Sequence, residues 1–249
     1  NYEITYFESK LNKETAQLTK GYDAICIFVN DKADKETLKI LQDNGVKLIA
    51  LRCAGYNNVD LENVGNIKVV RVPDYSPYAV AEHTVALLLN INRKIYKSYQ
   101  RVKKYNFSLD GLLGFDIHGK TIGVIGTGKI GQAFMRIMKG FGVNILAYDV
   151  YENKQISKEI GFKYVKLEEL LKNSDIISLH CPLTNDTEKI IDTNTINKMK
   201  KGVILLNTSR GKLIDTDSLI EGMITGKIGG AGLDVYEDEE VFFLRDMSN

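Results

Sequence analysis

One stretch in the middle of the chain decides the fold: Thr121-Ile122-Gly123-Val124-Ile125-Gly126-Thr127-Gly128-Lys129-Ile130-Gly131. It begins as an apolar run typical of a buried strand and continues into an amphipathic helix. Between the two, Gly126, Gly128 and Gly131 match the pattern Gly-x-Gly-x-x-Gly. The first glycine permits a tight turn, the second lets a phosphate approach the backbone, and the third allows close helix–strand packing. The stretch therefore predicts an anion-binding loop at a helix amino end.

An acidic residue follows the next predicted strand at the spacing that a dinucleotide site requires. Asp149 lies 18 residues beyond Gly131, close to the ~20 expected for a carboxylate that binds the adenine ribose. A carboxylate at that position repels a 2′-phosphate, so we expect NAD and not NADP as the cofactor. The alternative is an ordinary strand-to-helix turn in which Asp149 only caps the following segment.

Strands and helices alternate on both sides of this loop. Upstream we expect a strand at 24–29, a helix at 35–44, strands at 47–51 and 68–72, and one long crossover helix at 79–102. Downstream we expect strands at 121–125, 144–148, 176–179, 203–207 and 230–235, with helices at 130–141, 168–172, 193–198 and 216–225. The alternation predicts an α/β protein with a doubly wound parallel sheet.

The composition limits the other classes of function. The 249 residues are 44% hydrophobic and 26% charged, which suits two ordinary domains. Because 33 basic and 32 acidic side chains are scattered along the chain, we expect no nucleic-acid partner. No apolar run approaches the ~20 residues of a membrane span, and we expect a cytoplasmic protein. The isolated Cys26, Cys53 and Cys181 indicate small buried side chains and neither a disulfide framework nor a metal site.

Polar residues interrupt the apolar runs at the ends of the later strands, where ligands bind in open α/β sheets. They are His180-Cys181-Pro182, Asn207-Thr208-Ser209-Arg210-Gly211 and Asp234-Val235-Tyr236-Glu237-Asp238-Glu239. An arginine there can clamp a substrate carboxylate in bidentate fashion, and a carboxylate such as Glu239 can orient a catalytic histidine and raise its pKa. Taken singly, Arg210 also fits a surface ion pair, and Glu239 a solvated acidic loop.

At these residues the sequence resembles the D-isomer-specific 2-hydroxyacid dehydrogenase family. The glycine loop, His180-Cys181-Pro182-Leu183, 207–211 and 232–237 are similar to its signature stretches in order and spacing. Upstream, 51–60, 72–77 and Ala81-Glu82-His83 resemble the branch that reduces pyruvate to D-lactate. The resemblance implies an NAD-binding Rossmann domain at 77–249 and a discontinuous, flavodoxin-like α/β substrate domain that includes 1–76.

The resemblance also implies a role for individual residues. Arg210 would bind the carboxylate and keto groups of the substrate, Glu239 would pair with the acid/base histidine, and Asp234 would contact the nicotinamide end. Ala54 and Gly55 would offer backbone amides to the substrate carboxylate, and Tyr75 would line the pocket. Besides Gly126, Gly128 and Gly131, the residues implied to contact NAD are Lys129, Ile130, Asp149, Cys181, Pro182, Thr208 and Ser209.

The sequence departs from the family at the acid/base histidine. That residue belongs some 30 positions beyond Glu239, and none of His83, His118 and His180 replaces it. His180 matches the cofactor loop, so we interpret it as a structural or NAD-proximal residue. Since the chain begins at Asn1 and leaves Phe242 and Phe243 near its end, we expect it to be incomplete at both ends.

Two alternatives to pyruvate reduction stay open. One is a dehydrogenase for a larger 2-ketoacid such as phenylpyruvate or 2-ketoisocaproate, and the other is an NAD-sensing binding protein on the same fold. The residues around Ala54 and Tyr75 favour the enzyme. The predicted helix at 79–102 carries Val80, Leu87, Leu88 and Ile91 and is too apolar for an exposed crossover, which predicts that it packs against its counterpart in a homodimer or higher homo-oligomer.

Overall fold

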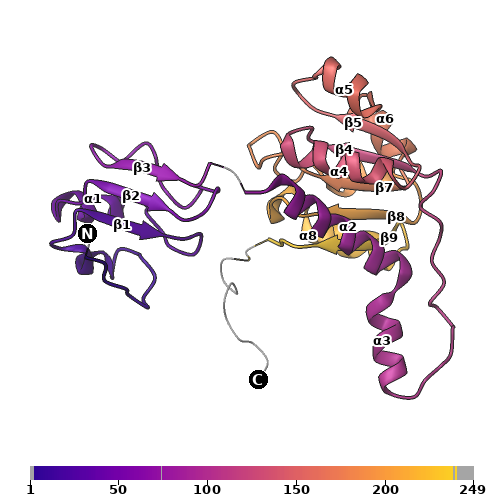
Figure 1. The fold of residues 1–249 in the computed structure, drawn as a ribbon, viewed down its shortest axis with the longest axis horizontal. Coiled ribbons are helices and arrows are strands. Elements are labelled where there is room, and N and C mark those ends of the chain that lie inside the picture. The colour runs from indigo at the N-terminus through magenta and orange to yellow at the C-terminus, as the bar shows by residue number, and fades with distance from the viewer. Residues whose placement is uncertain (1–2, 74, 238, 240–249) are drawn as a thin grey trace. The chain divides into compact units, whose positions relative to one another are not determined.

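The structure is a computed structural model that describes residues 3–73, 75–237 and 239. The chain forms two compact units that divide between Tyr75 and Ser76 (Figure 1). Phe242 and Phe243, on which the expectation of an incomplete C-terminal end was based, lie outside the described residues. No helix in the described ranges is long and apolar enough to cross a membrane.

The first unit is built on a three-stranded parallel sheet in the order β1-β2-β3. Its elements are β1 (Ala24–Ile27), α1 (Lys35–Asp43), β2 (Leu48–Leu51) and β3 (Lys68–Arg71), preceded by a 3-10 helix at Ala16–Thr19. Asp34 starts α1 because its side chain accepts a hydrogen bond from the Thr37 amide at 3.0 Å. Leu38 and Leu41 on α1 are fully buried with Ile49 of β2. The parallel βαβ arrangement predicted here is therefore confirmed.

The second unit holds a six-stranded parallel sheet in the order β6-β5-β4-β7-β8-β9. The strands are β4 (Thr121–Ile125), β5 (Asn144–Tyr148), β6 (Lys163–Tyr164), β7 (Ile176–Leu179), β8 (Val203–Asn207) and β9 (Ile228–Leu233). The chain starts at β4, runs outward to β6, and returns to the other side of β4 at β7. The order therefore reverses between β4 and β7, which is where a doubly wound sheet binds its ligand.

Helices cover both faces of this sheet (Figure 1). They are α2 (Pro77–Arg93), α3 (Ile95–Lys103), α4 (Lys129–Lys139), α5 (Lys154–Ile160), α6 (Leu167–Asn173), α7 (Thr193–Lys198) and α8 (Thr216–Ile224). Alternate residues of β4 point to opposite faces. Ile122 and Val124 pack into one core with Phe134 of α4, while Ile125 packs into the other with Leu170 of α6. These two cores make the sheet a rigid frame for the loops at its edge.

The long crossover helix predicted at 79–102 is two helices. Lys94 adopts a left-handed conformation with φ of 50°, which ends α2 and begins α3 in a new direction. The apolar face of α2 packs on its own sheet, because Leu87 and Ile91 cover Gly232 and Gly230 of β9. The reason given for a partner helix on α2 was therefore wrong, since this face already has its neighbour within the chain.

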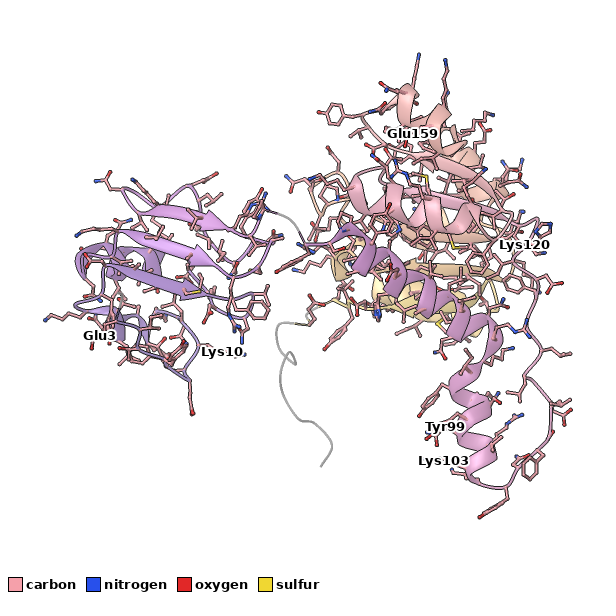
Figure 2. The ribbon with its side chains drawn as sticks, viewed as in Figure 1. Glu3, Lys10, Tyr99, Lys103, Lys120 and Glu159 are labelled. Atoms are coloured by element: carbon pink, nitrogen blue, oxygen red, sulfur yellow. The ribbon has the colours of Figure 1, made fainter. Side chains whose placement is uncertain are left out.

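A run of exposed apolar side chains lies on α3 and on the loop that follows it. Figure 2 shows Tyr99 and Lys103 on α3, which extends away from the sheet, and the Lys103 ammonium lies 4.9 Å from the centre of the Tyr99 ring. The loop at 104–116 runs back along α3, where Arg101 donates to the carbonyl of Asp110 at 2.6 Å. Large side chains stand exposed along this arm: Ile95, Tyr96, Tyr99, Val102, Tyr105, Phe107, Leu109 and Leu113.

Other boundaries differ from the sequence prediction in smaller ways. The elements α5 and β6 were missed because Lys154–Ile160 is a short polar helix and β6 has only two residues. Residues 4–7 take no regular structure, and Tyr6 is exposed. Strand β9 begins at Ile228 and ends at Leu233, two residues earlier at each end than predicted.

Candidate functional site

The glycine loop connects β4 to α4 at the point where the strand order reverses. Gly126 has φ of +96°, and a Cβ atom on it would meet the Cys181 amide nitrogen at 2.5 Å. A Cβ on Gly131 would meet the carbonyl oxygen of Gly126 at 2.2 Å. A Cβ on Gly128, by contrast, would meet nothing within 4 Å. The first and third glycines are therefore required by the protein's own packing, and the second leaves room for a ligand.

The amino end of α4 points its first amides into this loop. Gly128 occupies the N-cap position, and no side chain of the described residues caps the helix there. The first amide to find an intrahelical partner is that of Gln132, which donates to Gly128 at 2.9 Å. The amides of residues 129–131 precede it and, together with the helix dipole, favour a bound anion. This geometry fits the pyrophosphate of a dinucleotide.

Asp149 lies directly after β5, beside the glycine loop. Its Oδ2 accepts from the amide of Thr127 at 2.6 Å and from the Thr127 hydroxyl at 2.8 Å, and its Oδ1 accepts from the Tyr151 amide at 3.1 Å. Burial acts to raise the pKa of Asp149, but the hydrogen bonds from Thr127 and Tyr151 outweigh it, and the pKa is lowered. The carboxylate is therefore ionised and can accept from ribose hydroxyls.

A short relay fixes Thr127 in the orientation that Asp149 requires. Because the single hydroxyl proton of Thr127 goes to Asp149, the contact of 2.8 Å between Thr127 Oγ1 and Tyr164 Oη must be donated by the tyrosine. The amide of Asn153 in turn donates to Tyr164 Oη at 3.1 Å. Neither Thr127 nor Tyr164 was among the predicted site residues. The position of Thr127 between the first two glycines is the signal that could have identified it.

His180 and Cys181 follow β7 on the other side of the switch point. The Nε2 atom of His180 lies 2.8 Å from Ser178 Oγ, and its ring packs on Phe134 with 5.0 Å between ring centres. Burial lowers the pKa of His180 to about 4 and raises that of the Cys181 thiol to about 11. Both groups are therefore neutral near pH 7. His180 lines the cofactor loop as a structural residue, and Pro182 follows it.

Asn207 organises the loop that carries Arg210. Its side chain is buried, donates to the carbonyl of Arg210 at 2.8 Å and accepts from the Ser209 amide at 3.0 Å. Ser209 donates to the carbonyl of Cys181 at 2.6 Å, which links this loop to the end of β7. Arg210 itself is exposed, and one of its guanidinium nitrogens donates to Ser209 O at 2.8 Å. Within the part of the chain that the structure describes, its other donors have no hydrogen-bond partner and can bind an anionic ligand.

Thr208 and Asp234 are both held by helix α2. Thr84 donates its hydroxyl proton to Val80 O at 2.8 Å, so the 2.8 Å contact between the Thr84 and Thr208 hydroxyls is donated by Thr208. His83, one residue before Thr84, places Nε2 3.1 Å from Oδ1 of Asp234. His83 lies within the helix predicted at 79–102 but had no predicted role at the site.

Glu237 anchors the segment that leads from Asp234 to Glu239. Its Oε2 accepts from the Thr216 hydroxyl at 2.6 Å, and its Oε1 lies 3.9 Å from the ammonium of Lys189. Glu239, partly buried, accepts from the Tyr236 amide at 3.3 Å. The segment also lies against the Arg210 loop, since a Cβ on Gly211 would meet the Tyr236 carbonyl group at 2.1 Å.

The predicted substrate residues of the first unit lie around the loop after β2. The Ala54 amide donates to the hydroxyl of Tyr75 at 3.1 Å, and the Ala54 carbonyl accepts from Arg71 at 2.8 Å. The carbonyl of Gly55 accepts from the Cys53 thiol at 3.3 Å. Tyr75 and Ala54 are thus neighbours, and the Tyr75 hydroxyl accepts from one of the two amides that were predicted to bind the substrate carboxylate.

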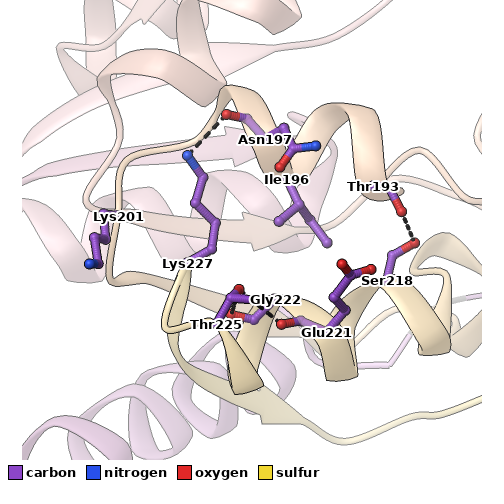
Figure 3. Close-up of a pocket in the computed structure, with 9 residues that line it drawn as sticks. All are labelled: Thr193, Ile196, Asn197, Lys201, Ser218, Glu221, Gly222, Thr225 and Lys227. Atoms are coloured by element: carbon purple, nitrogen blue, oxygen red, sulfur yellow. Dashed lines mark hydrogen bonds between the residues drawn. The ribbon is translucent and has the colours of Figure 1, made fainter.

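A separate hollow of about 370 Å³ lies between α7 and α8 (Figure 3). Ile196 and Glu221 line it, together with Lys201 and Lys227. Lys227 donates to the carbonyl of Asn197 at 2.9 Å. Lys201 and Lys227 precede β8 and β9, so the hollow lies at the amino ends of the strands, whereas the glycine loop and Arg210 follow strands. None of the predicted site residues lines it.

The two halves of the predicted cofactor site converge on one edge of the second sheet. The glycine loop, Asp149, the 180–182 segment, the 208–210 loop and Asp234 all follow the carboxyl ends of parallel strands. The open space at Gly128, the amino end of α4 and the ionised Asp149 fit the phosphates and ribose of NAD. Among the described residues, no three histidine, cysteine or acidic side chains gather where they could hold a metal ion.

A doubly wound sheet with this loop and this acid defines a dinucleotide-binding domain. Residues 85–246 match the model of the D-isomer specific 2-hydroxyacid dehydrogenase, NAD binding domain. The whole chain is 53% identical to 2-hydroxyacid dehydrogenase homolog 1 of Schizosaccharomyces pombe and 49% identical to the D-lactate dehydrogenase of Escherichia coli, and covers 75% and 76% of those proteins. The chain belongs to the D-isomer specific 2-hydroxyacid dehydrogenase family.

Similarity to a solved structure supports the same family. The D-lactate dehydrogenase of Aquifex aeolicus, complexed with NAD and lactic acid, is similar with a TM-score of 0.84 and 42% sequence identity, over 92% of this chain and 69% of that one. The family, the α/β fold with its Rossmann domain, and NAD as the cofactor are thereby confirmed. The protein is an NAD-dependent oxidoreductase of this family.

Proposed function

We propose that the protein reduces pyruvate to D-lactate with NADH and catalyses the reverse reaction with NAD. The observation that carries the proposal is the placement of Arg210 on the same sheet edge as the glycine loop, three residues after the end of β8. The D-lactate dehydrogenases of E. coli and A. aeolicus, at 49% and 42% identity, support the choice of substrate.

Arg210 is the residue assigned to the substrate. Its planar guanidinium can bind the carboxylate of a 2-ketoacid with two parallel hydrogen bonds and polarise the neighbouring keto oxygen. The buried Asn207 fixes the backbone beneath it through the carbonyl of Arg210, so the side chain starts from a set position. In the first unit, the Ala54 and Gly55 amides are the groups proposed to bind the substrate carboxylate, and Tyr75 is proposed to line the pocket.

The cofactor, when bound, supplies the hydride that reduces the keto carbon. Gly126, Gly128, Lys129, Ile130 and Gly131 would hold its pyrophosphate at the amino end of α4, and Asp149 its adenine ribose. The residues proposed to contact the rest of it are Cys181, Pro182, Thr208, Ser209 and Asp234. Glu239 is proposed to orient the acid/base histidine, which the family resemblance places beyond Glu239. His180 does not fill that role, because burial lowers the pKa of its ring to about 4 and keeps the ring neutral near pH 7.

The test is steady-state NADH oxidation by the intact gene product with pyruvate, phenylpyruvate and 2-ketoisocaproate in parallel. We expect the largest kcat/KM for pyruvate. Arg210→Lys keeps the charge but removes the bidentate geometry, worth about 1.5–3 kcal/mol, so kcat/KM should fall by about 10- to 150-fold. Arg136→Lys is the matched control, because Arg136 pairs with Glu159 at 2.7 Å on the outside of α4, and it should retain wild-type activity.

The panel also separates the alternatives. A higher kcat/KM with phenylpyruvate or 2-ketoisocaproate would replace pyruvate by a larger 2-ketoacid as the substrate. NADH binding without oxidation in the presence of any of the three ketoacids would favour the NAD-sensing protein. Equal activity of the Arg210→Lys variant and the wild type would refute the role given to Arg210.

We also propose that the protein forms a homodimer through the arm made by α3 and residues 104–116. A second copy is the occupant that the arm suits, because the large exposed side chains include Tyr99, Phe107 and Leu113 and stand together on one projecting element. Sedimentation of the intact gene product at micromolar concentration should give a dimer or larger assembly. Phe107→Ser combined with Leu113→Ser should release monomers, and a monomeric wild type would refute the proposal. The cytoplasmic location stays a prediction.

A further inference from the structure

An imidazole and a carboxylate meet at the carboxyl end of β9. His83 Nε2 lies 3.1 Å from Oδ1 of Asp234, and each side chain is about half exposed, at 49% and 50%. Asp234 follows β9 by one residue, and its amide donates to the carbonyl of Asn207 at 3.0 Å. The carboxylate therefore extends from a fixed backbone position and is held by a side chain from α2.

Both members of the pair are mounted on rigid parts of the second unit. Helix α2 is fixed on β9, where Leu87 contacts Gly232, and on the loop after β8 through the contact between Thr84 and Thr208. An exposed pair of this kind contributes only about 0–1 kcal/mol to the stability of a fold. The pair should therefore affect the binding of the ligand that Asp234 faces and not the stability of the fold.

The position of Asp234 in the sheet indicates which part of the cofactor it faces. A doubly wound domain binds one nucleotide over each half of its sheet. The half made by β4, β5 and β6 carries Asp149 and the ribose site for adenosine, so the half made by β7, β8 and β9 receives the nicotinamide nucleotide. The oxidised nicotinamide ring carries a positive charge, whereas the reduced ring is neutral. A carboxylate at the end of β9 therefore favours the oxidised form.

We propose that His83 is a positioning residue that holds Asp234 at the nicotinamide and makes the preference of the site for NAD over NADH depend on pH. This inference rests on the proposed function, because it needs a nicotinamide nucleotide at that half of the sheet. Histidine changes its charge between pH 5 and 8. Protonated His83 neutralises the Asp234 carboxylate and weakens the attraction for the oxidised ring, while neutral His83 leaves the negative charge in place.

The charged groups around α2 leave Asp234 as the partner of His83. Glu82 lies next to His83 on the helix and is exposed. The charged groups on or directly after the elements that pack against α2 are Lys97, Arg101 and Lys103 on α3, Lys129, Arg136 and Lys139 on α4, Arg210 after β8, and Glu237 and Glu239 after β9. Arg136 is paired with Glu159 at 2.7 Å, and Lys139 donates to the carbonyl of Gly161 at 3.1 Å. Within the described part of the chain, Asp234 is the acidic residue whose carboxylate contacts the His83 ring.

The other two histidines do not fit this role. His180 is buried beside Ser178, with its pKa lowered to about 4 by burial. His118 precedes β4, at the opposite end of the sheet from Asp234, and its Nδ1 lies 3.3 Å from the carbonyl oxygen of Phe141. His118 therefore offers a matched control, since it is an exposed histidine outside the cofactor edge.

The test measures the dissociation constants of NAD and NADH separately between pH 5.5 and 8.5, by titration calorimetry on the intact gene product. The variants are His83→Gln, whose amide nitrogen can replace Nε2 as a donor without titrating, His83→Leu, and His118→Gln. The charge change of His83 should lower the ratio of Kd for NAD to Kd for NADH by about 3- to 10-fold as pH rises in the wild type. His118→Gln should behave as the wild type.

In the His83→Gln variant, the ratio of Kd for NAD to Kd for NADH should change less than about 2-fold between pH 5.5 and 8.5. His83→Leu should lose the pH dependence and also bind NAD more weakly at pH 8.5, because Asp234 is no longer positioned. Full wild-type pH dependence in both His83 variants would overturn the inference. That result is distinguishable from a failure of the proposed function, because pyruvate reduction by the same preparations is measured independently.

Discussion

Two alanine substitutions in the glycine loop should separate ligand binding from folding. A Cβ on Gly128 meets nothing within 4 Å, and the residue has φ of −66° and ψ of −173°, which any amino acid adopts. A Cβ on Gly131 would lie 2.2 Å from the carbonyl oxygen of Gly126, a backbone atom that cannot rotate aside. The same chemical change therefore acts on the ligand at one position and on the protein at the other.

The expected magnitudes follow from these contacts. Gly128→Ala gains about 0.4–1 kcal/mol from the stiffer unfolded chain and loses a similar amount because alanine is a poor N-cap, so the free energy of unfolding should change by less than about 1 kcal/mol. The methyl group occupies the phosphate position and removes a hydrogen bond to a charged group, worth about 1.5–3 kcal/mol. The Kd for NADH should rise about 10- to 150-fold.

Gly131→Ala should instead lower the free energy of unfolding by about 1–3 kcal/mol, because the helix must move away from the strand. Urea unfolding without cofactor and fluorescence titration with NADH on the same preparations give both quantities. Wild-type affinity for NADH in the Gly128→Ala variant would refute the placement of the phosphates at this glycine. Wild-type stability in the Gly131→Ala variant would refute the close packing of α4 on the loop.

Three further predictions follow from the same structure. Thr127→Val removes the hydroxyl that donates to Asp149 at 2.8 Å, and the Kd for NADH should rise about 10-fold, corresponding to about 1–1.5 kcal/mol, in a fluorescence titration; an unchanged Kd would exclude Asp149 from the ribose site. The hydrogen bond from Lys189, followed by those from Ser218, lowers the pKa of Asp215 to about 2, so its stabilising contribution is present above pH 4 and is lost as pH falls from about 4 to 2. In urea unfolding, the loss of stability of Asp215→Asn relative to the wild type should shrink as pH falls over that window. A loss of stability that stays constant would contradict the assignment. Burial lowers the pKa of His180 to about 4, so an NMR titration should show a neutral imidazole down to about pH 5, and protonation near pH 6.5 would mean that the ring is exposed.

The sheet and the cofactor loop could be predicted because their determinants are local. The apolar run 121–125 and the three glycines after it satisfy strand, turn and helix requirements within a dozen residues, and β4 spans the predicted residues. The position of Asp149 beside the loop could be predicted for the same reason, because a fixed strand-helix-strand length sets its spacing from the loop. The parallel order then follows from the alternation of strands and helices.

The partners within the site could not be predicted because they are brought together from distant segments. His83 and Asp234 are 151 positions apart in the sequence, yet their side chains lie 3.1 Å apart, and only the packing of α2 on β9 makes them neighbours. The break at Lys94 was missed because lysine rarely adopts positive φ, so nothing in the helical pattern marks it. The apolar face of α2 was assigned to a second copy because a sequence pattern does not distinguish a chain's own sheet from a partner's helix.

The central claim is most directly tested by the chirality of the product. The intact gene product is incubated with pyruvate and excess NADH, and the lactate that forms is resolved by chiral chromatography. The proposed function predicts that one lactate forms for each NADH oxidised and that it is the D enantiomer. L-lactate as the product, or NADH bound at the glycine loop with no lactate formed, would contradict the claim.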